Sequence, residues 1–257
     1  MLGIFYTDER SKEVFKNLEK DHEVELIERF DEVVTMYDKL LLPMSGINEF
    51  GEVKMKGEMV KVPEEFWNHC SLDCTIFTGK ECNYLLRLPF KVVNLSNNEN
   101  FMIHNARLTA EGVLFLLIDN TSLGLKDISV DLLGFGNCGR EIYHLLKALD
   151  VQVRVIRRQV EHESSEFMSY LTWQQLKCHD VIINTSITNW MNESWMLNWE
   201  NPPLIINIVS DLHLSESVIH RLGGRVVNAG PLPSIIAHKS AAMILTKALC
   251  EEMNHGE

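Results

Sequence analysis

A glycine-rich turn between two apolar segments most strongly constrains what this chain can fold into. Residues 130–133 form a short apolar strand candidate, and Gly134, Gly136 and Gly139 follow it with the spacing G-x-G-x-x-G. A helical pattern comes next, and residues 151–156 are a second strand candidate. A strand, a glycine turn, a helix and a strand in this order are typical of a unit that binds a dinucleotide.

Each glycine of this turn has its own expected role. Gly134 permits the tight turn, Gly136 lets the backbone approach a pyrophosphate, and Gly139 lets the helix pack closely on the strand. Asn137 and Cys138 lie between them, in the first turn of the helix. Free N–H groups and the positive end of the helix dipole face an anion there. We therefore expect these five residues to bind the cofactor.

The end of the second strand indicates which dinucleotide is bound. An NAD site usually has an acidic residue at this point, but the chain has Arg157 and Arg158, and no carboxylate occurs before Glu161. Two guanidinium groups suit the 2′-phosphate of NADP. The alternative is that both arginines only solvate a strand end. Asn184 and Thr185, which end and follow a later strand, complete the predicted cofactor site.

Composition excludes several classes of protein. Of the 257 residues, 46% are hydrophobic and 23% are charged, and the net charge is −12. This acidity argues against binding to nucleic acid or to an anionic membrane surface. No apolar run approaches the ~18 residues of a transmembrane helix, and the first residues do not resemble a signal peptide. We expect a cytoplasmic protein.

The six cysteines do not predict a disulfide framework or a metal site. They are scattered along the chain, and free thiols are the expected state without a secretion signal. His69, Cys70 and Cys74 lie close together, but their spacing matches no closed zinc pattern. We expect no metal.

Alternating strand and helix patterns predict the α/β class with two Rossmann-like, doubly wound domains. We expect an N-terminal substrate domain over residues 1–120 and an NADP-binding domain over residues 121–233. Residues 234–257 should form a C-terminal helix that packs back towards the first domain. The patterns that support this division are expected strands at 2–6, 24–27, 40–42, 74–77, 90–95, 181–184, 204–208 and 225–227, a hairpin at 53–62, and helices from about 11, at 109–118 and at 234–252.

At this level of detail the chain resembles the A subunit of dipicolinate synthase over nearly its whole length. The order and spacing of several short motifs, rather than any one of them, carry the resemblance. In addition to the glycine turn and Arg158, these motifs are Asp8-Glu9-Arg10, Leu42-Pro43-Met44-Ser45, Cys74 to Gly79 followed by Asn83-Tyr84-Leu85, Asn105 with Thr109, Glu111 and Gly112, and Gly230 with Pro233, Ala237 and Lys239.

The resemblance implies an activity. The family oxidises 4-hydroxytetrahydrodipicolinate or dihydrodipicolinate to pyridine-2,6-dicarboxylate in the mother cell of sporulating bacteria, with NADP as the cofactor. The family works with the B subunit of dipicolinate synthase, and we also expect a homo-oligomer. The cofactor supplies the hydride chemistry, so the protein orients the ring and removes protons.

The two carboxylates of such a substrate require cationic groups or N–H donors. The resemblance implies that Arg10, Ser45 and Asn105 bind the substrate, and that Lys239 is a functional cation. Lys239 lies near the start of the terminal helix, where a cation does not suit the helix dipole.

The reaction also needs a proton acceptor, for which there are two candidates. Glu111 and His238 could each serve, so that Glu111, His238 and Lys239 are the expected catalytic residues. Each also has a structural alternative: Glu111 can support the first turn of its helix, and His238 can be a solvated helix residue.

The chain departs from the family at three places. Asn137 replaces an arginine, His238 replaces a proline, and residues 207–214 replace a segment rich in Arg, Pro and Gly. The last change leaves the true substrate open.

Two other functions therefore stay open. An NADP-dependent dehydrogenase of 2-hydroxy acids would use a histidine with an acidic partner, and His213, Glu216 and His220 offer these groups. The altered segment at residues 207–214 would also suit a non-catalytic NADP-binding sensor or scaffold protein.

Overall fold

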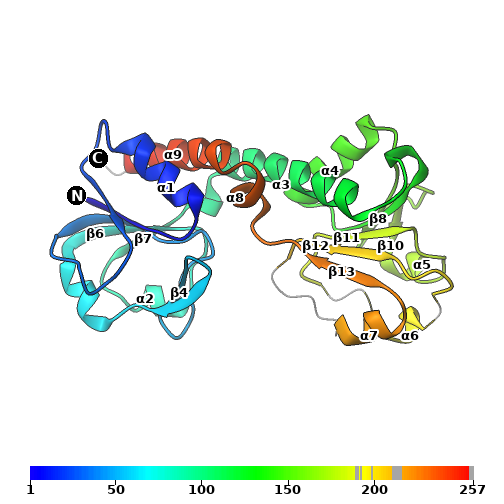
Figure 1. Cartoon of the computed structure of the whole chain (residues 1–257), viewed down its shortest axis with the longest axis horizontal. Coiled ribbons are helices and arrows are strands. Elements are labelled where there is room, and N and C mark those ends of the chain that lie inside the picture. The colour runs from blue at the N-terminus through cyan, green and yellow to red at the C-terminus, as the bar shows by residue number, and fades with distance from the viewer. Residues whose placement is uncertain (189–190, 192, 198, 210–215, 255–257) are drawn as a thin grey trace. The chain divides into compact units, whose positions relative to one another are not determined.

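The computed structural model describes residues 1–188, 191, 193–197, 199–209 and 216–254 (Figure 1). The chain forms two compact units. Unit 1 combines Met1–Asn105 with Ile236–Glu257, and unit 2 is Ala106–Ile235. The division falls inside one long helix, α3 (Glu99–Asn120), which contributes residues to both units.

Unit 2 contains a six-stranded parallel sheet with the order β10-β9-β8-β11-β12-β13. Numbered along the chain within this unit, the order is 3-2-1-4-5-6, which is that of dinucleotide-binding folds. The expected doubly wound α/β class is confirmed. The strands are β8 (Ser129–Leu133), β9 (Gln152–Arg157), β10 (Phe167–Ser169), β11 (Val181–Asn184), β12 (Leu204–Asn207) and β13 (Arg225–Asn228).

Helices cover both faces of this sheet. On one face, α4 (Asn137–Ala148) buries Ile142 and Leu146 against Val130 and its neighbours, together with part of α3. On the other face Trp173 is buried in a separate core. The elements of that second layer are α5 (Tyr170–Trp173), α6 (Glu193–Met196) and α7 (Glu216–Arg221).

Because both faces of this sheet are buried, alternation of apolar and polar residues in β9 does not mark a solvent-exposed face. The alternation of Val153 and Val155 with polar residues suggests one solvent-exposed face, but Arg154 between them is only 7% exposed. Its register partner Asp131, in the middle of β8, is fully buried. Parallel strands between two helical layers are buried on both sides, so polar residues inside them must be paired.

Unit 1 contains a five-stranded parallel sheet with the order β2-β1-β3-β6-β7. Counted along the chain this is 2-1-3-4-5, the other common doubly wound order. The strands are β1 (Leu2–Phe5), β2 (Val24–Ile27), β3 (Tyr37–Leu41), β6 (Cys70–Thr78) and β7 (Lys91–Asn94).

Two helices far apart in the sequence share one face of this sheet. The C-terminal helix α9 (His238–Asn254) lies beside α1 (Glu9–Leu18), as the blue and red helices of Figure 1 show, and Val14 and Leu245 belong to their common core. Asn17 Nδ2 donates to Thr246 Oγ1 at 3.3 Å. The C-terminal helix thus returns to the N-terminal unit, as expected.

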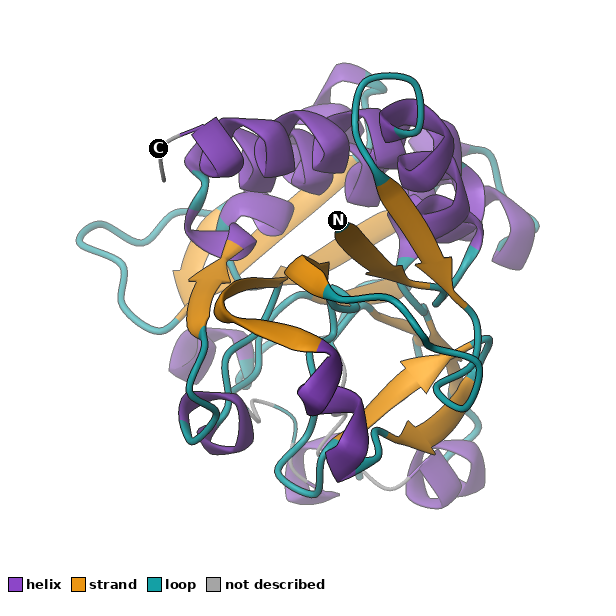
Figure 2. Ribbon diagram, turned by 90° about the vertical axis from the view of Figure 1, so that its left-hand side faces the viewer, coloured by secondary structure: helices purple, strands orange, loops and turns teal. Residues whose placement is uncertain are grey.

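The opposite face of the unit 1 sheet carries shorter elements. Phe66 and Trp67 are buried there with the inner side chains of a hairpin. Figure 2 shows the strands of the sheet with these short helices and loops around them. The elements are β4 (Glu52–Met55), β5 (Glu58–Lys61), the 3-10 helix η1 (Glu64–His69) and α2 (Asn83–Leu86).

Two helix boundaries differ from expectation. The helix expected from Thr109 begins ten positions earlier, because Asn98 Oδ1 accepts a hydrogen bond from Phe101 N at 2.9 Å and caps it. The expected terminal helix is two helices, α8 (Leu232–Ile236) and α9, which are separated at Ala237. Short 3-10 turns at η2 (Leu95–Asn97) and η3 (Leu125–Asp127) complete the connections.

Helix α3 resembles a membrane-spanning helix in length and composition, although the sequence pattern predicted no such helix. Of the described residues, it alone is long and apolar enough to cross a membrane by length and composition, with a mean hydropathy of 1.3. However, 44% of that window is buried inside the protein, and Val113 and Leu117 belong to the core of unit 2. Core helices pass the same test, so the indication of a membrane span is weak.

Candidate functional site

The predicted cofactor residues meet at the point where the strand order of unit 2 reverses. Strands β8 and β11 are neighbours there, and ligands bind beyond the carboxyl ends of such strands. Gly134 follows β8, and Thr185 follows β11. The backbone N–H and the hydroxyl of Thr185 both donate to Leu133 O, each at 2.9 Å. Two segments far apart in the sequence thus form one surface.

The three glycines differ in what surrounds them. Gly134 has a φ of +100°, in the region that favours glycine. A Cβ on Gly139 would lie 2.4 Å from Gly134 O, so helix and turn could not pack as closely with any larger residue. Among the described residues, a Cβ on Gly136 would meet nothing within 4 Å. The backbone of Gly136 therefore faces open space at the N-terminus of α4, where the sequence predicts the pyrophosphate.

The two residues between these glycines differ in exposure. Asn137 is exposed, whereas Cys138 is partly buried. Burial raises the pKa of the Cys138 thiol, and a hydrogen bond with Thr109 opposes this shift. Cys138 is therefore a protonated thiol near neutral pH, which argues for a packing role rather than nucleophilic chemistry.

Three arginines surround the glycine turn. The Arg157 guanidinium lies 5.6 Å from the centre of the Phe135 ring, and that of Arg140 lies 6.0 Å from it. Arg158 Nη2 donates to Thr188 Oγ1 at 3.3 Å. All three arginines are exposed, so their charges are available to a phosphorylated ligand. Arg140 was not predicted, although its place directly after the last glycine of the turn was a usable signal.

Unit 1 has its own reversal point, between β1 and β3. Arg10 follows β1 in the first turn of α1 and is 8% exposed. Among the described residues its guanidinium forms an ion pair only with Asp8, at 3.9 Å. Burial lowers the pKa of Arg10, and Asp8 opposes this shift. Such a weakly compensated buried cation is suited to an anionic ligand.

Ser45 lies in the loop after β3, and this loop is tightly packed. Gly46 N donates to Pro43 O at 2.8 Å, and Gly46 has a φ of +75°. A Cβ on Gly79, which follows β6, would lie 2.3 Å from Met44 O. Ser45 itself is exposed, so its backbone and hydroxyl are accessible at the rigid turn.

His238 and Lys239 begin helix α9 in unit 1. Both lie near Glu13 of α1: the pKa of Glu13 is lowered first by a hydrogen bond from Lys16, and the charges of Lys239 and His238 lower it further. Lys239 is exposed and His238 is partly buried.

The predicted residues therefore divide between the units. Glu111 is exposed on the part of α3 that belongs to unit 2, with the cofactor residues. The residues of unit 1 that are predicted to bind the substrate or to act in catalysis are Arg10, Ser45, Asn105, His238 and Lys239.

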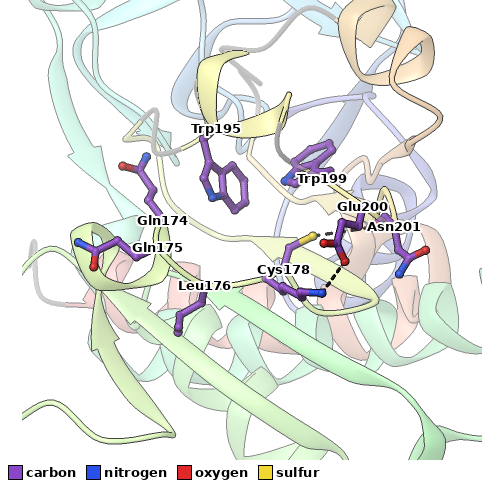
Figure 3. Close-up of a pocket in the computed structure, with 9 residues that line it drawn as sticks. Gln174, Gln175, Leu176, Cys178, Trp195, Trp199, Glu200 and Asn201 are labelled. Carbon is purple, nitrogen blue, oxygen red and sulfur yellow. Dashed lines mark hydrogen bonds and ion pairs between the residues drawn. The ribbon is translucent and has the colours of Figure 1, made fainter.

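A cavity in unit 2 was not predicted (Figure 3). It has a volume of about 330 Å³, and the rings of Trp195 and Trp199 border it with their centres 5.3 Å apart. Cys178 also borders it, and burial raises the pKa of this thiol to about 11. The residues that line the cavity include none of the predicted site residues. Within the described residues, no group of three His, Cys, Asp or Glu side chains could hold a metal ion.

Comparison with known proteins shows which proteins this chain resembles. No family model matches the chain. The A subunit of dipicolinate synthase from Bacillus subtilis is 26% identical over 230 residues, covering 82% of this chain and 76% of that protein. The crystal structure of the same subunit from Bacillus halodurans has a TM-score of 0.83 and 24% identity, covering 97% of this chain and 96% of that one. The resemblance to the A subunit of dipicolinate synthase is confirmed.

A more distant neighbour shares the fold alone. The NADPH-dependent glyoxylate/hydroxypyruvate reductase of Sinorhizobium meliloti has a TM-score of 0.59 at 14% identity, covering 100% of this chain and 96% of that one. The motifs that resemble dipicolinate synthase lie at strand ends in this fold: residues 8–10 follow β1, residues 42–45 follow β3, and residues 74–79 close β6. Ligand-binding residues are expected at such positions.

His213, one of the two histidines that the 2-hydroxy acid alternative offers, lies outside the described residues. Its predicted companions Glu216 and His220 are on α7. The Glu216 carboxylate already accepts a hydrogen bond from Asn228 Nδ2.

Proposed function

We propose that this chain is the NADP-dependent dehydrogenase component of a dipicolinate synthase, acting in the mother-cell cytoplasm of a sporulating bacterium. Similarity to the A subunit of that enzyme in sequence and fold supports an oxidoreductase that uses a nicotinamide dinucleotide. One observation carries the proposal: the open backbone at Gly136 follows β8 at the point, between β8 and β11, where the order of a 3-2-1-4-5-6 sheet reverses.

In the proposed reaction, 4-hydroxytetrahydrodipicolinate loses water, and the resulting dihydrodipicolinate loses a hydride and a proton to become pyridine-2,6-dicarboxylate. When bound, NADP supplies the hydride acceptor. Arg157 and Arg158 hold its 2′-phosphate, while Gly134 to Gly139 and the N-terminus of α4 hold its pyrophosphate. The exposure of both arginines beside the turn supports this choice of NADP over NAD.

The substrate carboxylates are proposed to bind Arg10, Ser45 and Asn105. The buried Arg10, with only Asp8 at 3.9 Å among the described residues, supports this role, because a carboxylate would complete its charge compensation. Glu111 or His238 would accept the proton, and Lys239 would supply a cation. The name of the related protein, one subunit of a synthase, also supports a partner, the B subunit of dipicolinate synthase, and we propose a homo-oligomer of the chain.

Cofactor preference tests the first half of the proposal. We expect NADPH to bind more tightly than NADH in calorimetric titrations. Replacing Arg157 and Arg158 together by Ala should weaken NADPH by about 2–4 kcal/mol, because each charged hydrogen bond contributes ~1.5–3 kcal/mol before coupling, and should leave NADH almost unchanged. Arg29→Ala is the matched control, because Arg29 is an exposed arginine of unit 1 paired with Asp31. Equal affinity of the unmodified chain for both cofactors would contradict the assignment.

Turnover tests the second half. With a cognate B subunit and 4-hydroxytetrahydrodipicolinate, we expect dipicolinate to form with one NADPH for each product. A 2-hydroxy acid dehydrogenase is the second candidate, favoured by the fold shared with the glyoxylate/hydroxypyruvate reductase. It predicts reduction of a 2-keto acid that His220→Ala abolishes. NADPH binding without any turnover would instead favour a sensor or scaffold protein.

A further inference from the structure

Three neighbouring strands of unit 2 end in the same residue type. Asn184, Asn207 and Asn228 are the last residues of β11, β12 and β13, and they are register partners across the sheet. Asn184 is 5% exposed and Asn207 is 1% exposed. Buried amides need hydrogen-bond partners on both their oxygen and their nitrogen, and these side chains supply partners to one another.

The hydrogen bonds between them run in one direction. Asn184 Nδ2 donates to Asn207 Oδ1 at 2.9 Å, and Asn207 Nδ2 donates to Asn228 Oδ1 at 3.1 Å. Asn228 Nδ2 donates to Glu216 Oε1 at 2.5 Å. We call Asn184, Asn207, Asn228 and Glu216 the amide chain. An ionised carboxylate only accepts, so Glu216 fixes the sense of the chain at its outer end.

Independent contacts fix the same orientations. Asn207 Nδ2 also donates to Val209 O at 2.9 Å, so its amide cannot turn over without losing the two bonds it donates and the one it accepts from Asn184. Asn184 Oδ1 accepts from Ser186 N at 3.2 Å. Each amide therefore has one arrangement, and hydrogen bonds in such a chain strengthen one another.

The inner end of the chain reaches the predicted cofactor site. Ser186 belongs to the loop 184–188, in which Thr185 bonds Leu133 O beside the glycine turn. Ser186 Oγ accepts from Thr188 N at 3.1 Å, and Thr188 Oγ1 accepts from Arg158. The amide chain and this loop thus form a continuous path of hydrogen bonds from Glu216 to Arg158.

We infer that Asn207 is a positioning residue for the cofactor, because it holds Asn184 and through it the loop 184–188 against the glycine turn. The loop needs such support, since residues 185–188 are only partly buried or exposed and the bond from Ser186 N to Asn184 Oδ1 is one of its ties to the sheet. The inference rests on the proposed function in one respect, namely that the ligand of this loop is a phosphorylated dinucleotide.

Asn207→Asp tests the inference, because it keeps the size of the side chain and removes both donors. At pH 8 the ionised Asp faces two oxygens, Asn228 Oδ1 and Val209 O, and the Kd for NADP⁺ should rise by about 10- to 100-fold. Burial raises the pKa of a carboxyl group, and the protonated form regains one donor. The ratio of the variant's Kd to that of the unmodified chain should therefore be smaller at pH 5.5 than at pH 8.

Asn94→Asp is the matched control. Asn94 ends β7 in unit 1, and its Oδ1 accepts from Ser96 N at 3.0 Å, a bond that Asp retains. This variant should leave NADP⁺ binding unchanged at both pH values. Hydrogen exchange of the free protein supplies a second measurement that needs no cofactor: Asn207→Asp should speed exchange of the amides of residues 185–188 selectively, and more at pH 8 after correction for intrinsic rates.

The outcomes separate the inference from the proposed function. If the unmodified chain does not bind NADP⁺, the proposed function fails, while exchange in the loop still decides the role of Asn207. The inference would be overturned if Asn207→Asp changed neither the hydrogen exchange of residues 185–188 nor the Kd for NADP⁺. A loss of binding that is the same at both pH values, with exchange accelerated throughout unit 2, would also overturn it, because that result describes general destabilisation.

Discussion

A buried ion pair between β8 and β9 gives the sharpest prediction of stability. Asp131 in β8 is fully buried and accepts from Arg154 Nε at 2.7 Å and from Arg154 Nη2 at 2.8 Å. It also accepts from Trp173 Nε1 at 2.8 Å and from His179 N at 3.0 Å. Four donors therefore converge on one carboxylate, and Arg154 is only 7% exposed.

Asp131→Asn removes the charge and keeps the shape. Breaking one side of a buried ion pair costs about 3–5 kcal/mol, since the remaining charge is left without compensation. The new amide NH₂ also faces a donor, and one unsatisfied buried donor adds about 1–3 kcal/mol. Arg154 retains its bond to Lys177 O, which limits the loss. We expect a total of about 4–6 kcal/mol, a large part of the ~5–15 kcal/mol by which a domain is stable.

Urea unfolding followed by tryptophan fluorescence measures this change, because Trp173, Trp195 and Trp199 all belong to unit 2. With a slope of about 2–3 kcal/mol/M, the midpoint should fall by roughly 2 M. The matched control is Asp150→Asn, which removes an exposed ion pair with Lys126 and should cost below about 1 kcal/mol. Adding Arg154→Met to Asp131→Leu should recover stability relative to Asp131→Asn. If Asp131→Asn costs no more than Asp150→Asn, the reasoning is refuted.

Three further expectations concern the site and a neighbouring thiol. Gly136→Val should abolish dinucleotide binding in calorimetry while circular dichroism stays unchanged, because its Cβ points into the open space predicted for the pyrophosphate; binding by the folded variant would contradict the assignment. Arg10→Ala and Lys239→Ala should each reduce turnover in the presence of the B subunit and leave NADPH binding intact; unaltered kinetics in both would refute their role. Alkylation of Cys178 should be slow at pH 8 and accelerate towards pH 11, because a pKa of about 11 leaves almost no thiolate at the lower pH; peptide mapping across this range checks it, and rapid labelling at pH 8 would contradict it.

Local patterns predicted much of the fold because apolar strand patterns and the turns that follow them agreed. The glycine turn with its flanking strands defined the core of unit 2, and the strands that end at Leu41 and Thr78 were visible as apolar runs. The predicted helix boundaries were wrong where a single residue sets the boundary. The start of α3 depends on the cap at Asn98, and the break before α9 falls at Ala237, which has no breaking signal of its own.

Residues of the candidate site were predictable when a motif fixed their place, as for Gly134 and Arg158. The sequence contains no information on the space in front of Gly136 or the burial of Arg10, which depend on distant segments. Periodicity alone does not reveal the burial of Arg154, since alternation within a strand marks an exposed face only when one face of the sheet is uncovered. An opposite charge inside the preceding strand, Asp131, was the available correction.

The amide chain shows a signal that periodicity does not detect. Three apolar strands end in the same letter, as VIIN, LIIN and RVVN, although asparagine is disfavoured in strands. Repetition of a disfavoured residue at equivalent positions implies that the positions meet, because an unpaired buried amide is costly and neighbours of the same type can satisfy one another. In a parallel sheet, the last residues of successive strands lie along one edge, and that edge is where ligands bind. The same reasoning therefore connects a pattern of single residues to the place where this chain is proposed to hold its cofactor.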